Sequence, residues 1–137
     1  MPNSLRLAAL PALLVLLQAG LTGCGTIQED RRAEALLAAA NTHHEAVRWG
    51  YWEAVVELMH ADARKDLDLT ALKNVRVTGY EVVGPSEITP EGKSLRLARI
   101  DYVLQDEQRL KQVLDRQDWR WDDTRKVWLL HSGLPAF

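Results

Sequence analysis

The side chains best suited to proton transfer lie in two places along the chain. His43 and His44 fall in a helical pattern, and Asp101 and Tyr102 follow one another in a strand-like pattern. An imidazole or carboxylate that points into a pocket can act as a general base when its pKa is shifted. Strand alternation sends Asp101 and Tyr102 to opposite faces, so they cannot line the same pocket wall. His44 and Asp101 are the candidate bases, but no fixed spacing pairs a histidine with an aspartate.

The histidines do not form a recognisable metal motif. Neighbouring residues on a helix point about 100° apart, so His43 and His44 cannot easily share one ion. His60 and His131 are remote in sequence, and the chain has neither a His-Glu-x-x-His motif nor a cysteine cluster. We therefore expect no metal and no cofactor, and we expect the helix histidines to be hydrogen-bonded near a sheet.

Cys24 is the only cysteine, which excludes an intramolecular disulfide. It follows a short apolar run, residues 7–17, preceded by a single charge, Arg6, and interrupted by Pro11. A membrane-spanning helix needs roughly 20 apolar residues. A positive start, a short apolar run and small residues before a cleavage point are typical of a secretory signal peptide. The alternative, a retained membrane helix, fits this length less well.

Leu21-Thr22-Gly23-Cys24 resembles the lipobox of bacterial lipoproteins. The resemblance implies a diacylglyceryl thioether on Cys24, cleavage before it and acylation of the new amine; the alternative is a free or buried thiol. Several acyl chains anchor a protein stably where one is marginal. In enterobacterial lipoproteins an aspartate after the cysteine favours inner-membrane retention. Gly25 stands there instead, so the resemblance implies the periplasmic face of the outer membrane, with the inner membrane as the alternative.

Cleavage before Cys24 would divide the chain into a signal peptide, residues 1–23, a lipidated tether, residues 24–30, and one domain, residues 31–137. The formal net charge is −2 and the charges are well mixed. No basic block or stripe is present, so nucleic acid is not an expected partner.

Hydrophobic periodicity predicts two helices before the strands. The first starts near Arg31 and ends at Gly50, a candidate glycine cap. The second begins at Trp52 and continues to Ala63. The expected buried face of the first helix consists of Ala33, Leu37, Ala40, His44 and Val47, with Leu36 and His43 beside them.

From Asn74 the period changes to two, which predicts strands. The first ends at Gly84, and the phase slips at Gly79, where a bulge is expected. Three more strands follow, at about 94–105, 109–121 and 126–131. We expect a polar turn over residues 122–125, which would place Trp119 opposite Trp128.

Two helices followed by four strands in hairpin order predict an α+β fold in which the helices pack on a curved antiparallel meander. Two segments, Arg48-Trp-Gly-Tyr-Trp52 and the hairpin Trp119-Arg-Trp-Asp-Asp-Thr-Arg-Lys-Val-Trp128, resemble the NTF2-like, or cystatin-like, α+β cone. The resemblance implies a pocket between the sheet and the first helix, where family enzymes place an aspartate or a His–Asp pair. The chain departs from the family in its short loops and in lacking a third long helix. The alternative is another small helix-plus-antiparallel-sheet fold.

Five tryptophans against one phenylalanine are unusual for a chain of this length. Trp52 is expected in the core by its helical period. An exposed aromatic patch on the sheet would mark a ligand or partner surface, whereas antiparallel sheets bury one face in any case. The residues concerned are Trp119, Trp121, Trp128, Tyr80 and Tyr102. We expect the strand charges to form a solvated cross-strand lattice: Arg96, Arg99, Arg116 and Arg120 with Asp101, Asp115 and Asp118.

The leading hypothesis is a non-catalytic lipoprotein held at the membrane through Cys24 that binds an envelope protein or a small hydrophobic ligand. The first alternative is a cone-type enzyme that performs proton transfer on a small hydrophobic substrate with His44 or Asp101. The second is a structural homodimer built through the tryptophan-rich strands.

Overall fold

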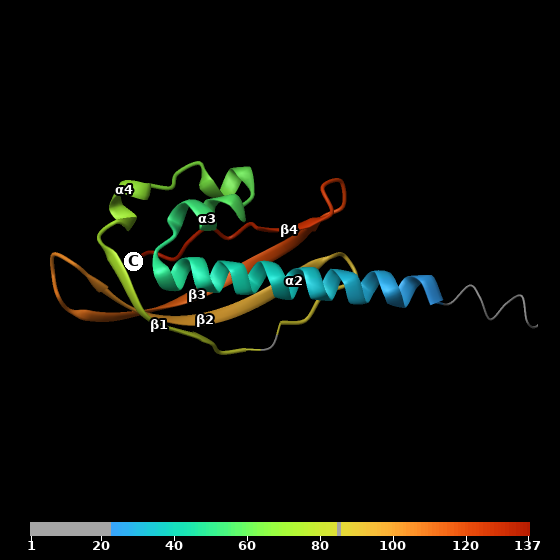
Figure 1. Ribbon diagram of the computed structural model, residues 1–137, viewed down its shortest axis with the longest axis horizontal. Coiled ribbons are helices and arrows are strands. Elements are labelled where there is room, and N and C mark those ends of the chain that lie inside the picture. The colour runs from blue at the N-terminus through green and yellow to red at the C-terminus, as the bar shows by residue number, and fades with distance from the viewer. Residues whose placement is uncertain (1–22, 85) are drawn as a thin grey trace, which may run out of the picture. The chain divides into compact units, whose positions relative to one another are not determined.

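The computed structural model describes residues 23–84 and 86–137 (Figure 1). The chain divides into two compact units, residues 1–34 and 35–137. Of the first unit only residues 23–34 are described, and they are helical. The predicted signal peptide falls almost entirely on residues 1–22, outside the described residues. Its cleavage, and the lipidation of Cys24, remain predictions.

Within residues 23–84 and 86–137, four helical elements precede a four-stranded sheet, which confirms the α+β class. All strand pairs are antiparallel and the order is β1-β2-β3-β4, a meander. Figure 1 shows the strands as a curled sheet. The elements are α2 (Gly23–Trp49), α3 (Trp52–Glu57), the 3-10 helix η1 (Ala61–Arg64), α4 (Leu69–Leu72), β1 (Val75–Val82), β2 (Lys93–Leu104), β3 (Leu110–Asp122) and β4 (Val127–Leu130).

The first helix starts earlier than its pattern predicts. Residues 25–30, expected as an extended tether, belong to α2. The buried face is also turned: Leu37 is 61% exposed, whereas Leu36, Ala40, His43 and Val47 are buried. These four positions are spaced by four, three and four residues, the spacing of one helix face. Leu36 and His43, expected beside the core face, therefore lie on it.

The second helix is shorter than expected, because its end joins the sheet. α3 stops at Glu57, and the amide of Leu130 in β4 donates to the carbonyl of Leu58 over 2.9 Å. The amide of His60 donates to the carbonyl of Leu130 over 2.8 Å. A backbone that pairs with a strand cannot continue as a helix, so residues 58–60 cover the outer edge of β4.

The core fills the space between the helices and the concave face of the sheet. Trp119, Ile100 and Leu130 have almost no exposed surface. The other members of the same cluster are Leu36, Ala40, Ala46, Val47, Trp52, Val55, Met59, Leu72, Val75, Val77, Tyr102 and Trp128.

Two local details concern the strands. The register of β1 against β2 shifts between Val77 and Gly79, which confirms the bulge. In the last hairpin Trp121, not Trp119, pairs with Trp128, and their rings lie 5.7 Å apart. The turn begins one residue later than expected, which shifts the cross-strand partners by two residues. Asp122 belongs to β3: it pairs with Val127, and its carboxylate accepts from two amides of the following turn.

Candidate functional site

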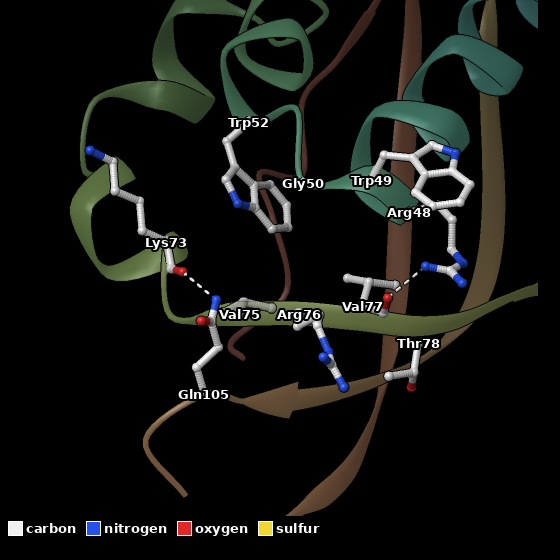
Figure 2. A pocket seen from close by; sticks show the side chains of 10 residues that line it. All are labelled: Arg48, Trp49, Gly50, Trp52, Lys73, Val75, Arg76, Val77, Thr78 and Gln105. Atoms are coloured by element: carbon white, nitrogen blue, oxygen red, sulfur yellow. Dashed lines mark hydrogen bonds between the residues drawn. The ribbon is translucent and has the colours of Figure 1, made fainter. Parts of the chain in front are cut away.

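A groove of about 650 Å³ opens between the end of α2, the start of α3 and strand β1 (Figure 2). Arg48 and Trp49 enter it from α2, Trp52 from α3, and Lys73 from the segment before β1. Val75 to Thr78 supply the strand side, and Gln105 lies after β2. Its volume is in the range of sites that hold a small ligand or a few residues of a peptide.

The sharp turn after α2 creates this groove. The amide of Tyr51 donates to the carbonyl of Ala46 over 2.8 Å, and the amide of Gly50 donates to the carbonyl of Val47 over 3.2 Å. This pair of bonds is a Schellman motif, which needs a left-handed residue at Gly50, where φ is +71°. The predicted glycine cap is thus confirmed, and it lets α3 begin at Trp52.

The groove is basic. Arg48, Lys73 and Arg76 line it, and none of its described lining residues is acidic. The Arg48 guanidinium donates to the carbonyl of Val77 over 2.7 Å and lies 4.8 Å from the ring centre of Trp49. Lys73 and Arg76 are exposed, and no carboxylate forms an ion pair with either in the described part of the chain. The groove therefore presents positive charge to solvent.

A second polar group lies in the core, on the concave side of the sheet. The Gln117 amide donates to the hydroxyl of Tyr80 over 2.6 Å and to the carboxyl of Asp115 over 2.7 Å. Its oxygen accepts from the Trp119 indole over 3.1 Å. Burial raises the pKa of Asp115 to about 6 and that of Tyr80 to about 12. We call these four residues the interior network.

The two helix histidines lie beside the interior network. His43 is fully buried, edge-on to Trp119 at 5.7 Å, and neither ring nitrogen has a hydrogen-bond partner among the described residues. Burial, followed by the positive charge of Arg96, lowers its pKa to about 4. His44 stacks on Tyr80 with ring centres 4.1 Å apart, and burial is the main reason why its pKa is lowered. The hydrogen bonds expected for His43 are absent from the described structure.

The other candidate base, Asp101, does not join them. It lies on the opposite face of β2 from the buried Ile100 and Tyr102, and its carboxylate accepts from Gln112 over 2.7 Å. It also packs against the bulge, since a Cβ on Gly79 would lie 3.0 Å from its Oδ2. The structure therefore brings His44 and Tyr80 together but leaves Asp101 on the outer face.

The sequence interpretation of the strand charges as one solvated lattice did not predict the interior network. Asp115 is 2% exposed and Gln117 is fully buried. The signal was present, because both residues have the same strand parity as Trp119 and therefore point to the same face. Arg120 pairs with Asp118 within β3 and not across strands, and Arg99 pairs across strands with Glu81, which was not among the expected partners.

The candidate aromatic surface is mostly core, which is the alternative that the burial of one sheet face favours. Trp119, Trp128 and Tyr102 are buried, and Trp121 and Tyr80 are half-buried. Exposed apolar side chains on the outer face of the sheet are leucines instead: Leu95, Leu110 and Leu114. A homodimer built on exposed tryptophans of the sheet would therefore lack its contact residues.

His60 and His131, remote in sequence, are stacked with ring centres 4.2 Å apart. The His60 ring accepts from the amide of Asp62, whose carboxylate lies 3.6 Å from the same nitrogen. Within residues 23–84 and 86–137, no three histidine, cysteine or carboxylate side chains gather as a metal site would require. In the same ranges no helix has the length and apolar character needed to cross a membrane.

Comparison with known proteins adds no relative: no protein-family model matches this chain, and no curated protein matches its sequence.

Proposed function

We propose that the protein is a lipid-anchored, non-catalytic binding module of the cell envelope, and that the basic groove is its binding site. Two independent features support this proposal. The leader and the lipobox-like Leu21-Thr22-Gly23-Cys24 indicate export and attachment, at the periplasmic face of the outer membrane by default. The folded unit carries an open groove with three cations and two tryptophans.

We also propose that the domain belongs to the NTF2-like, or cystatin-like, cone fold. The order of the elements, the curled antiparallel meander and the closing tryptophan hairpin support this assignment. The cone fold hosts both enzymes and non-enzymes, so the function is argued from the site and not from the fold.

The observation that carries the binding role is the separation of the groove from the groups with shifted pKa values. A proton-transfer enzyme needs its base within hydrogen-bonding reach of a bound substrate. His43 and Asp115, which have the largest shifts among the histidines and carboxyls of the described chain, are buried in the core and do not line the groove. Arginine and lysine beside tryptophan are well suited to bind anionic groups.

The anchor is tested by expressing Cys24→Ala in the native host with radioactive palmitate. The wild type should be labelled and should sediment with the outer membrane, whereas Cys24→Ala should lose the label. A label that persists on Cys24→Ala would refute lipid attachment at this residue. A second variant, Cys24→Ser, keeps the size of the side chain and should lose the label equally, because it also lacks the thiol.

The binding role is tested on the purified lipidated protein in detergent micelles. Tryptophan fluorescence is followed while benzoate, an aromatic anion, or benzylamine, its cationic counterpart, is added. Benzoate should change the emission of Trp49 and Trp52, and Lys73→Glu with Arg76→Glu should abolish that change. Equal responses to both compounds, or a response insensitive to the double variant, would contradict the assignment of the groove.

A further inference from the structure

The groove has an unusual floor, because strand β1 is an edge strand whose backbone faces it. The amide of Gln105 donates to the carbonyl of Asn74 over 2.9 Å, while the next residue, Val75, stands opposite Leu104. In an antiparallel ladder, a bond between these flanking residues makes Val75 and Leu104 a non-hydrogen-bonded pair. The amide and carbonyl of Val75 therefore point away from β2, towards the open side.

Val77, two residues further along, has the same orientation. Its carbonyl is the one that accepts from Arg48 over 2.7 Å, and Arg48 lies on the groove side of β1 (Figure 2). Since the amide and carbonyl of a strand residue point the same way, the Val77 amide also faces the groove. Backbone groups at alternate residues of an edge are the template on which another strand pairs.

At the opposite edge of the sheet, the outer side of the last strand, β4, has no such template. There, Leu58 and His60 take up the backbone of Leu130 in β4 through bonds of 2.9 and 2.8 Å. Along Val75 to Val77, no strand of the described chain pairs with the outer side of β1. The edge of β4 is thus covered by the chain itself, whereas the edge of β1 along Val75 to Val77 opens into the groove.

The positive charge around the edge of β1 indicates which kind of peptide segment could pair with it. Arg48, Lys73 and Arg76 lie around the free edge, and the described lining contains no carboxylate. A cationic segment would be repelled, and a purely apolar one would leave the cations unpaired. An extended segment with carboxylates would pair its backbone with Val75 and with the amide of Val77, whose carbonyl already accepts from Arg48. Its side chains would pair with the cations.

We propose that the groove binds an extended acidic peptide segment of a partner protein by adding it as a strand to the edge of β1. This inference rests on the proposed function, since it names the ligand class of the same site. Trp52 and Trp49 would cover the added strand from the helix side. The shortness of the accessible edge implies that only a few residues of the segment pair with it.

The experiment uses the purified lipidated protein in detergent micelles and fluorescein-labelled hexapeptides. The test peptide is Thr-Glu-Val-Glu-Thr-Glu, and its binding is followed by fluorescence polarisation. One control peptide carries N-methyl groups on alternate amides, in both possible phases, so that it keeps the charge but cannot pair as a strand. A second control replaces each Glu by Lys. Benzoate and citrate are added separately as small anions.

The proposal expects the acidic peptide to bind, at least one N-methylated form to lose at least tenfold in affinity, and the Lys peptide not to bind. Lys73→Glu with Arg76→Glu should weaken the acidic peptide at least tenfold. The matched control is Arg116→Glu, an equal change of charge per site on the exposed face of β3, away from the groove. It should change the affinity less than twofold.

Three results would overturn the inference. If both N-methylated peptides bind as well as the parent, charge alone holds the peptide and no strand is added. If the small anions bind and the peptide does not, the groove remains a binding site, but for a different ligand. If neither binds, the proposed function of the groove fails as well.

Discussion

The basic groove and the interior network are two polar regions that meet on strand β1, where Thr78 lines the groove and Tyr80 belongs to the network, yet they are built in opposite ways. In the groove Lys73 and Arg76 face solvent, and the outward backbone groups along Val75 to Val77, apart from the Val77 carbonyl that accepts from Arg48, pair with no strand of the described chain. In the interior, Gln117 satisfies Tyr80, Asp115 and Trp119 at once, and the titratable groups are shifted towards their neutral forms. The contrast indicates that the interior serves the stability of the fold and that the groove is free to bind.

Removing the centre of the interior network should cause the largest loss in the free energy of unfolding. Gln117→Leu leaves the Tyr80 hydroxyl, the Asp115 carboxyl and the Trp119 indole without their partner. A buried polar group without a partner costs about 1–3 kcal/mol, so the loss in the free energy of unfolding should reach about 3 kcal/mol or more. Urea denaturation at pH 7 measures it. Gln112→Leu, on the exposed face of the same strand, should cost less than about 0.5 kcal/mol. Similar losses for both variants would refute a structural role for the network.

The pH dependence of Asp115 tests whether the interior is as closed as its geometry indicates. Its pKa in the folded state, about 6, is higher than the unfolded value, so the folded protein holds this proton more tightly. The wild type should therefore lose stability through this group as the pH rises from about 4 to about 6, by about 2–3 kcal/mol in all. Asp115→Asn removes this loss and should be more stable than the wild type above pH 7. An advantage of the variant that stays constant from pH 4 to pH 8 would contradict burial of the charge.

His43 should show the opposite trend. Its folded pKa of about 4 is below the unfolded value, so protonation opposes folding and stability is lost as the pH falls from about 6.5 to about 4. His43→Leu should remove this loss, since neither ring nitrogen has a hydrogen-bond partner to lose within the described residues. The contributions of His43 and Asp115 have opposite signs, so between pH 4 and 6 Asp115→Asn should make the stability rise more steeply with pH than in the wild type, and His43→Leu should make it rise less steeply or fall. Urea denaturation across this pH range measures both slopes.

The smallest effect on stability is expected in the groove. Lys73 and Arg76 are exposed and form no ion pair in the described part of the chain, so Lys73→Glu with Arg76→Glu should change the free energy of unfolding by less than about 0.5 kcal/mol for each site. Binding should nevertheless be lost, as described above. A large loss of stability would show that these cations support the fold, and the contrast between the two regions would disappear.

Local features of the fold were predictable from local sequence. Gly50 ends α2 in a left-handed conformation that few other residues adopt. Gly79 marks the bulge, where an added Cβ would lie 3.0 Å from the Asp101 carboxylate. In the last hairpin the predicted cross-strand partners differ from the observed ones by two residues. The predicted turn begins at Asp122 because this residue is polar. In the structure its side chain caps the turn, while its backbone still pairs with Val127.

The candidate site was less predictable. Strand parity shows that Asp115 and Gln117 share a face with Trp119, but it does not show that a helix covers that face as far as those positions. The end of the second helix was also beyond local reasoning, since Leu58 and His60 pair with a strand about 70 residues later. Among the groove residues, only the segment Arg48 to Trp52 has a recognisable sequence pattern. Lys73, Arg76 and Gln105 have none.

By itself, the sequence determined the predicted leader and lipobox, the α+β order and the glycines that turn the chain, because each depends on residues that are neighbours in sequence. Which charges are buried, and which of the edges of β1 and β4 is covered, follows from the tertiary structure alone. Both depend on what packs against a strand from elsewhere in the chain: residues 58–60 cover β4, and Arg48, Lys73 and Trp52 surround β1 but leave its edge accessible.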